Sequence, residues 1–183
     1  MRSLRYPAPR LTDGVVVLRR WAKSDIACVE EAARDPRIPE GTTVPAAFTE
    51  AEGLAWIERQ WGRVENGEGL SLAIADAGSE EALGAVVLLL RPQPASAGIG
   101  YWVVERARGR RLASRAVGLL ARWALMDAGL ARVEALVEPE NTASQRVLES
   151  VGFQREGHLR AYLVFDARRA DALIYSLLPT DVG

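Results

Sequence analysis

Residues 104 to 114 read VERARGRRLAS and place four arginines around one glycine, Gly109, where an apolar run gives way to a helical pattern. A helix start presents backbone N–H groups without intrahelical acceptors and a partial positive charge, so it attracts anions. Gly109 has no Cβ and lets the backbone approach a phosphate closely, and arginine grips phosphate through its planar fork. The stretch therefore predicts a site for a phosphate-bearing ligand at residues 108 to 114, without naming the ligand.

The better-known phosphate loops do not match here. The stretch lacks the G-K-[ST] ending of a P-loop, and no G-x-G-x-x-G follows an early strand with an acidic residue about 20 positions later. A solvated basic turn with a glycine of convenience is the alternative reading of the same residues.

The surrounding pattern predicts a continuous α/β succession. Ser24 is expected to cap a helix, and Thr49, with Glu52 three residues on, forms a capping box that opens a second helix through residue 65. Residues 35 to 48 carry three prolines and are expected to be loop. The expected strands are 14–21, 70–76, 82–91, 97–105 and 131–138, with two more around the turn DARRAD in the tail; helices follow Gly109, stopping at Gly129, and Asn141, stopping at Gly152.

Composition sets the class of protein. A chain of 183 residues with 49% apolar residues fits a single domain, 1–183, with a core of its own. Its formal net charge of −1 argues against a protein dedicated to nucleic acid or an anionic membrane. Cys28, the only cysteine, excludes an internal disulfide and a thiolate metal site. We expect a cytoplasmic protein with no membrane span, no signal peptide and no metal.

The stretch GIGYWVVERARGRRLASRA (98–116) resembles the acyl-CoA signature of the GNAT superfamily of N-acyltransferases, whose pyrophosphate loop reads Q/R-x-x-G-x-G/A. Here Arg106 to Arg111 occupy that loop, and Arg111 stands where the family has glycine or alanine. Further on, VEPENTASQRVLESVGFQREGHLR (137–160) and the closing DALIYSLL (171–178) are similar to the RimJ/RimL-like branch, which includes the ribosomal-protein N-terminal acetyltransferases. The likeness covers residues 84 to 178.

The resemblance implies a mixed α/β GNAT-type fold, in which about seven mostly antiparallel strands splay at the centre and helices cover both faces. Acetyl-CoA or another acyl-CoA would lie in the splay as co-substrate. Backbone groups of Trp102, Val103 and Val104 would pair with the pantetheine arm, Asn141 would contact that arm, and Arg146 would reach the nucleotide end. The amides of seven successive residues would hold the pyrophosphate: Arg108, Gly109, Arg110, Arg111, Leu112, Ala113 and Ser114. An arginine with helical dihedrals at 111 would preserve this cradle.

The implied reaction is attack of a primary amine on the thioester. Ser144 resembles the serine that members of this branch place near the sulfur, and we expect it to protonate the leaving thiolate. Glu138, and alternatively Glu105, are candidate bases acting through water. A dedicated base is less needed for an α-amine, with a pKa near 8, than for lysine at about 10.4. Asn141, Ser144 and both glutamates also have plain structural readings, as helix cap, surface serine and solvated strand ends.

The acceptor pocket is expected to come from the first third of the chain, with Trp56, Trp61 and Trp102 as walls, although aromatic residues on a helix are more often core. His158 and Cys28 are expected to be structural. The acceptor stays open between a protein N-terminus and a small amine, and the resemblance is compatible with a homodimer. Competing hypotheses are a non-catalytic acyl-CoA-binding module, a donor such as succinyl-CoA, and a nucleic-acid-binding protein that uses RARGRR as its patch.

Overall fold

The structure is a computed structural model that describes residues 4–165 and 168–182. Its helices are α1 (Ile26–Arg34), α2 (Arg37–Gly41), α3 (Glu50–Glu65), α4 (Leu112–Met126) and α5 (Thr142–Val151), with short 3-10 turns η1 (Lys23–Asp25), η2 (Glu105–Ala107) and η3 (Pro179–Asp181). Its strands are β1 (Leu11–Thr12), β2 (Val16–Arg19), β3 (Gly69–Asp76), β4 (Ala82–Leu90), β5 (Ser96–Val103), β6 (Arg132–Val137), β7 (Gln154–Val164) and β8 (Arg169–Leu177).

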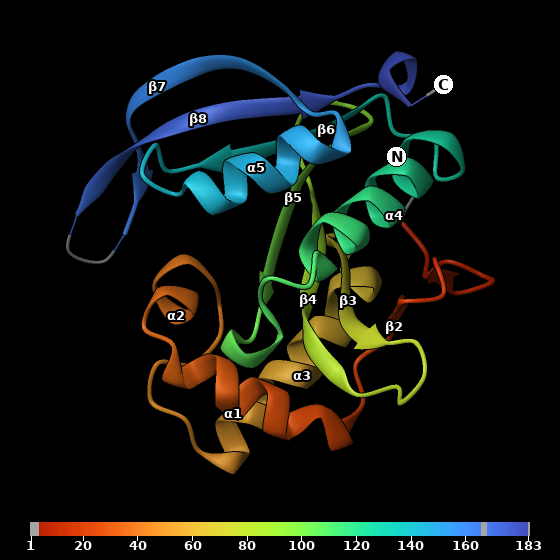
Figure 1. Cartoon of the computed structure of the whole chain (residues 1–183), viewed down its shortest axis with the longest axis vertical. Coiled ribbons are helices and arrows are strands. Elements are labelled where there is room, and N and C mark those ends of the chain that lie inside the picture. Colours follow the sequence, from red (N-terminus) through yellow and green to blue (C-terminus); the bar gives the residue numbers. More distant parts are fainter. Residues whose placement is uncertain (1–3, 166–167, 183) are drawn as a thin grey trace.

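The eight strands form one sheet in the order β1-β2-β3-β4-β5-β6-β8-β7 (Figure 1). All neighbours are antiparallel except β5 and β6. The expected mixed sheet is confirmed; it has one strand more than the seven expected, because the two-residue β1 is too short to leave a pattern in the sequence. The tail strands β7 and β8 also form as expected, while residues 166–167 of the turn between them lie outside the described residues.

The sheet opens at its one parallel pair. β5 and β6 are in register only from Ser96 to Gly98, opposite Arg132 to Glu134. Beyond that point β5 stays paired with β4, and β6 stays paired with β8. The central splay implied by the family resemblance is therefore present, and it lies just ahead of the arginine-rich stretch that follows β5.

Neighbouring residues of β5 show that helices cover both faces of the sheet. Successive side chains of a strand point to opposite faces. The Tyr101 hydroxyl reaches Ser144 in α5, whereas the Trp102 ring packs 6.2 Å from the Trp56 ring of α3, centroid to centroid. Figure 1 shows α1, α2 and α3 gathered at one end of the molecule and α5 beside the β7–β8 hairpin at the other.

Helix boundaries were partly predictable. The Thr49 hydroxyl accepts from the Glu52 amide at 3.2 Å, and Gly152, with φ of 102°, ends α5, as expected. Ser24 does not cap α1; the chain enters through η1, where the Asp25 carboxylate accepts from the Ala22 amide at 2.8 Å. None of the helices in the part of the chain that the structure describes is long and apolar enough to cross a membrane.

The segment 35–48 is not all loop, because it contains the short helix α2. Pro36 stands at its N-cap with φ of −60°, and Pro39 falls within the first turn. A first-turn proline removes an N–H that has no intrahelical acceptor, so both prolines are compatible with helix there. The expectation of loop was therefore wrong for residues 37–41, because Pro36 and Pro39 lie at the start of a helix.

Candidate functional site

The splay between β5 and β6 has two edges, which we call its lips, and the backbone of β5 forms one of them. In an antiparallel pair, alternate residues turn their N–H and C=O groups toward the partner strand, and the others turn them away. The Val104 amide donates to the carbonyl of Leu83, near the start of β4, at 3.0 Å, and Trp102 pairs with Ala85 two residues along. Tyr101 and Val103, between these bonded positions, therefore present their backbone groups to the splay.

This register corrects one detail of the sequence-based expectation. The backbone groups of Trp102 and Val104 pair with β4. Of the three residues expected to pair with a pantetheine arm, only Val103 therefore turns its backbone groups toward the splay. The Val103 carbonyl also accepts from Arg108 Nε at 3.1 Å. Tyr101, which sequence reasoning missed, supplies the second set of outward-facing groups.

The turn into α4 has two residues in the left-handed region, Gly109 with φ of 77° and Arg111 with φ of 59°. Arg111 is the N-cap of α4, and its left-handed backbone replaces the helical one that we expected. A side chain at such a backbone costs about 1–2 kcal/mol, and glycine would avoid this cost. The arginine keeps the turn that glycine would adopt without strain.

The same turn leaves a row of backbone donors free. Among residues 4–165 and 168–182, the amides of residues 109 to 114 donate to no protein acceptor. The Arg108 amide, expected to belong to the cradle, donates instead to the Glu105 carbonyl at 3.1 Å. Six successive N–H groups therefore remain at the start of a fifteen-residue helix, where the helix dipole adds positive potential. This arrangement suits a diphosphate.

The arginine side chains around Gly109 are mostly engaged elsewhere. Arg106 pairs with Glu31 at 2.9 Å and Glu81 at 2.8 Å, Arg108 pairs with Asp35, and Arg110 lies 3.8 Å from Asp76. Among the described residues, Arg111 has no carboxylate within salt-bridge distance. The carboxylates thus hold the loop to α1 and to the β3–β4 turn, and the amides rather than the arginines dominate the cradle.

The other lip of the splay is the start of α5. Asn141 caps this helix, because its Oδ1 accepts from the Ser144 amide at 3.1 Å. The Ser144 Oγ lies 2.7 Å from the Tyr101 hydroxyl, so a side-chain contact bridges the two lips. Arg146, two residues further, is exposed. Ser114 lies beside α5 as well, since its hydroxyl accepts from the Ser150 hydroxyl at 3.3 Å.

Glu138 lies just after β6 and is held by Arg168. The two guanidinium nitrogens of Arg168 donate to the two carboxylate oxygens at 2.5 and 3.1 Å. Arg168 also contacts Glu40 of α2 at 2.8 Å and stacks on the Phe165 ring, 4.1 Å from its centroid. The alternative base, Glu105, is exposed in η2.

The three tryptophans expected to line the acceptor pocket, Trp56, Trp61 and Trp102, lie in or against the core. Trp56 is 2% exposed and donates from Nε1 to Thr43 Oγ1 at 3.1 Å, and the half-buried Trp61 donates to the Trp21 carbonyl at 2.8 Å. Cys28 is buried, and its burial raises the pKa of the thiol to about 12. His158 pairs with Asp171 at 2.8 Å, which suits the structural role expected for it.

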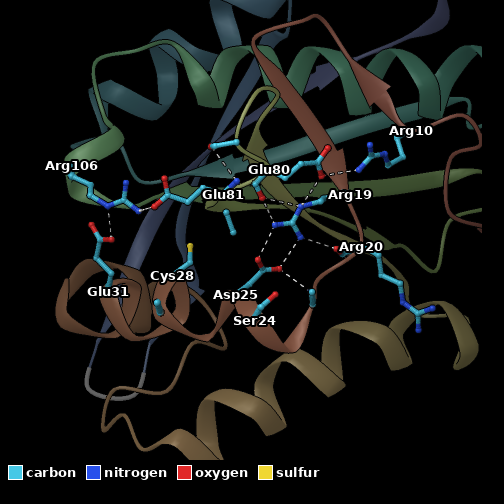
Figure 2. Close-up of a pocket in the computed structure, with 14 residues that line it drawn as sticks. Arg10, Arg19, Arg20, Ser24, Asp25, Cys28, Glu31, Glu80, Glu81 and Arg106 are labelled. Atoms are coloured by element: carbon cyan, nitrogen blue, oxygen red, sulfur yellow. Dashed lines mark hydrogen bonds and ion pairs between the residues drawn. The ribbon is translucent and has the colours of Figure 1, made fainter.

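A surface depression of about 690 Å³ lies elsewhere, between α1, the end of β2 and the β3–β4 turn (Figure 2). Arg19 crosses it and binds Asp25 at 2.7 and 2.8 Å and the Glu80 carbonyl, while Arg106 joins Glu31 to Glu81. Of the predicted loop residues Arg106 to Arg111, Arg106 lines it. Its ion pairs join Arg10 to Glu80, Arg19 to Asp25, and Arg106 to Glu31 and Glu81, so we interpret it as a structural network rather than the candidate site.

The splay and the free amides at the start of α4 are the arrangement that the sequence resemblance implied, and the cap of α5 is the structural role that Asn141 was also expected to have. A model of the acetyltransferase (GNAT) domain matches residues 16–154, more than half of the chain. The chain belongs to the GNAT acetyltransferase family. It is 42% identical over 80 residues to the uncharacterized N-acetyltransferase p20 of Bacillus licheniformis, a match that covers 44% of this chain and 45% of p20.

Two further relatives extend the comparison. The chain is 31% identical over 121 residues to the probable N-acetyltransferase YjcK of Bacillus subtilis, covering 65% of this chain and 67% of YjcK. The solved structure of Mycobacterium smegmatis RimJ in complex with CoA-disulfide superimposes with a TM-score of 0.79 and 28% identity, over 93% of this chain and 85% of that one. These likenesses agree with the branch suggested by residues 137–160.

The free amides around Gly109 predict that a negatively charged side chain at this position weakens the binding of acetyl-CoA. Nothing lies within 4 Å of a Cβ added at Gly109, so Gly109→Asp and Gly109→Asn fit equally and carry the same left-handed strain. A carboxylate beside a diphosphate should lower acetyl-CoA affinity on the order of 100-fold, as expected for like charges near a surface. Isothermal titration of each variant with acetyl-CoA measures this change in affinity. The asparagine variant should retain acetyl-CoA affinity within about 10-fold of the unaltered protein. Equal losses of affinity in both variants would mean that the charge of the side chain does not determine binding at this loop.

The left-handed N-cap predicts a difference between two substitutions of Arg111. Arg111→Ala and Arg111→Gly both remove the guanidinium, but only glycine adopts φ of 59° without strain. The glycine variant should therefore be more stable than the alanine variant by about 1 kcal/mol. Urea unfolding of the two proteins measures the difference, and equal midpoints would contradict a strained backbone at this cap.

Proposed function

We propose that this protein transfers an acetyl group from acetyl-CoA to a primary amine by direct attack on the thioester. The observation that carries the proposal is the row of six free amides at the start of α4, placed beside a splay whose lip exposes unpaired backbone groups of β5. The splay suits an extended amide-bearing arm, and the amides suit the diphosphate at its end. The likeness to RimJ, solved with CoA-disulfide, supports the same placement.

The residues that would hold the cofactor follow from this geometry. Tyr101 and Val103 would pair with the pantetheine amides, and Trp102 and Val104 would support them from within the sheet. The amides of Gly109 to Ser114 would bind the pyrophosphate, with Arg111 adding charge. Asn141 keeps its amide nitrogen for the pantetheine while its oxygen caps α5, so its two expected roles are compatible. Arg146 would reach the nucleotide end.

The reaction needs two proton transfers. The amine nitrogen forms a bond to the thioester carbon, the C–S bond breaks, and the thiolate takes a proton while the acylated nitrogen loses one. Ser144, at the start of α5 beside the lip of the splay, would protonate the thiolate. Glu138 would accept the amine proton through water, and its pairing with Arg168 restricts it to that indirect role.

The acceptor proposed is an amine at a protein N-terminus or on a small molecule. An N-terminal α-amine suits a site whose candidate base is occupied, because its pKa near 8 leaves a usable neutral fraction at pH 7. Arg168 joins the candidate base Glu138 to Glu40 of α2, and Trp56 and Trp61 would support the acceptor side from the core. No metal enters this chemistry, and the buried lone thiol of Cys28 fits a reducing cytoplasm.

Titration with acetyl-CoA, CoA and succinyl-CoA, followed by a thiol-release assay against peptides and small amines, tests the function. We expect micromolar binding of acetyl-CoA and release of CoA with at least one amine. Binding without release from any amine would favour the non-catalytic module, and preference for succinyl-CoA would change the donor. Absence of binding by all three would contradict the placement of the cofactor.

Ser144→Ala tests the proton donor. Removal of a general acid lowers turnover by about 10²- to 10⁴-fold in enzymes that depend on it. Because Ser144 caps nothing with its hydroxyl and Asn141 still accepts from its amide, acetyl-CoA affinity should stay within about twofold. Steady-state kinetics and titration on the same protein separate the two effects. Asn141→Ala removes the cap of α5 and serves as the comparison, because it should weaken acetyl-CoA binding and lower stability instead. Unchanged turnover in Ser144→Ala would contradict the role of Ser144 as proton donor.

A further inference from the structure

The phenol of Tyr101 contacts Ser144 at two atoms. Its oxygen lies 2.7 Å from Ser144 Oγ and 3.2 Å from the Ser144 carbonyl oxygen. Tyr101 comes from β5 and Ser144 from α5, so this pair spans the two lips of the splay. Neither residue's spacing in the sequence, 43 positions apart, indicates the contact.

The hydrogens of this pair have two arrangements with the same heavy-atom positions. The carbonyl oxygen can only accept, and Tyr101 has one hydrogen to donate. When Tyr101 donates to the carbonyl, the Ser144 hydroxyl donates to the phenol oxygen and its hydrogen is held there. When Tyr101 donates to Oγ, the Ser144 hydrogen is free to point elsewhere. A rotation of two hydroxyl groups converts one arrangement into the other.

We propose that Tyr101 is a positioning residue that holds the Ser144 hydrogen in the resting site and releases it toward the sulfur as the thioester breaks. This inference rests on the proposed function, in which Ser144 protonates the leaving thiolate. As the C–S bond breaks, the Ser144 hydrogen moves to sulfur, and the Tyr101 hydrogen turns from the carbonyl oxygen to Oγ and stabilises the negative charge left there. The proton lost by the acylated nitrogen passes through water to Glu138, which releases it to solvent, and a proton from solvent restores Ser144.

The surroundings of Tyr101 fit a hydroxyl that turns but does not ionise. Burial raises the pKa of Tyr101 to about 12, against the lowering effect of its bond to Ser144. The phenol therefore keeps its hydrogen over the working pH range and acts by donating it in a hydrogen bond. A first-turn serine can otherwise bond back to its own helix, and the contact with Tyr101 at 2.7 Å competes with that alternative.

The chain provides a matched control in Tyr175. This tyrosine of β8 is fully buried, and its hydroxyl donates to Glu149 of the same helix α5 at 3.1 Å. Tyr175→Phe thus removes a phenol that joins the sheet to α5 without touching Ser144. A purely structural effect of losing such a bond should appear in this variant as well as in Tyr101→Phe.

The experiment compares Tyr101→Phe, Tyr175→Phe, Ser144→Ala and the double variant Tyr101→Phe/Ser144→Ala. Hydroxylamine, a generic nucleophile, is used together with the best amine from the acceptor panel, so that the result does not depend on one acceptor. Thiol release gives kcat and KM, titration gives acetyl-CoA affinity, and thermal unfolding gives stability.

We expect Tyr101→Phe to lower kcat about 10-fold or more, with acetyl-CoA affinity within about twofold of the unaltered protein. Tyr175→Phe should keep its kcat within about twofold, whatever it does to stability. The double variant should be no slower than Ser144→Ala alone, because the phenol acts only through the serine.

Unchanged kcat in Tyr101→Phe would overturn this inference and leave the proposed function standing, and so would a loss in the double variant equal to the product of the single losses. A similar kcat loss in both tyrosine variants would also overturn it, in favour of helix placement. If the unaltered protein releases no thiol with any nucleophile, the proposed function fails and takes this inference with it.

Discussion

Two parallel strands that part after three residue pairs control the rest of this structure. Backbone groups in the middle of a sheet are normally paired, and leaving them unpaired away from water costs free energy. Here β5 and β6 separate beyond Gly98 and Glu134, because each follows its antiparallel neighbour rather than the other. The separation creates an edge within the sheet, and an edge accepts an extended chain of amides as readily as it accepts a strand. The family's co-substrate has such a chain.

The turn into α4 solves a related problem with charge. Four arginines packed around one glycine would repel one another in a short loop. Arg106, Arg108 and Arg110 are instead paired with carboxylates from α1, its C-cap and the β3–β4 region, so they fasten the loop to the body of the protein. The proposed anion site is thereby left to backbone amides, and the left-handed residues Gly109 and Arg111 set the course of the chain through them. A rigid row of neutral donors discriminates by shape, whereas free arginines would bind many anions.

The features that could be predicted from the sequence are those set by residues close together along the chain. Local patterns predicted most strands and helices, the Thr49 cap and the Gly152 stop, because each arises from residues within one turn. The helix α2 was missed because five residues, one of them a proline and preceded by another, are too few to show a helical period. Pairings such as Arg108 with Asp35 and Arg168 with Glu138 join residues 73 and 30 positions apart, and composition shows only that the charges balance. The resemblance to a family supplied the proposed cofactor residues, but not the register of β5, so it could not show which backbone groups face the splay.

That register is fixed by packing on the opposite face of the sheet. The rings of Trp21, Trp56 and Trp102 lie 5.0 to 6.2 Å apart, and Trp102 can join them only from its present position in β5. A slip of one residue reverses the face of every side chain in a strand. It would turn Trp102 toward α5, remove Tyr101 from Ser144, and exchange the backbone groups that face the splay. The tryptophan cluster therefore determines the chemistry of a site that lies across the sheet from it. This coupling explains how a protein with an open central sheet keeps both lips in place: the strand is locked by apolar rings on one face, and the phenol of Tyr101 on the other face meets the first turn of α5.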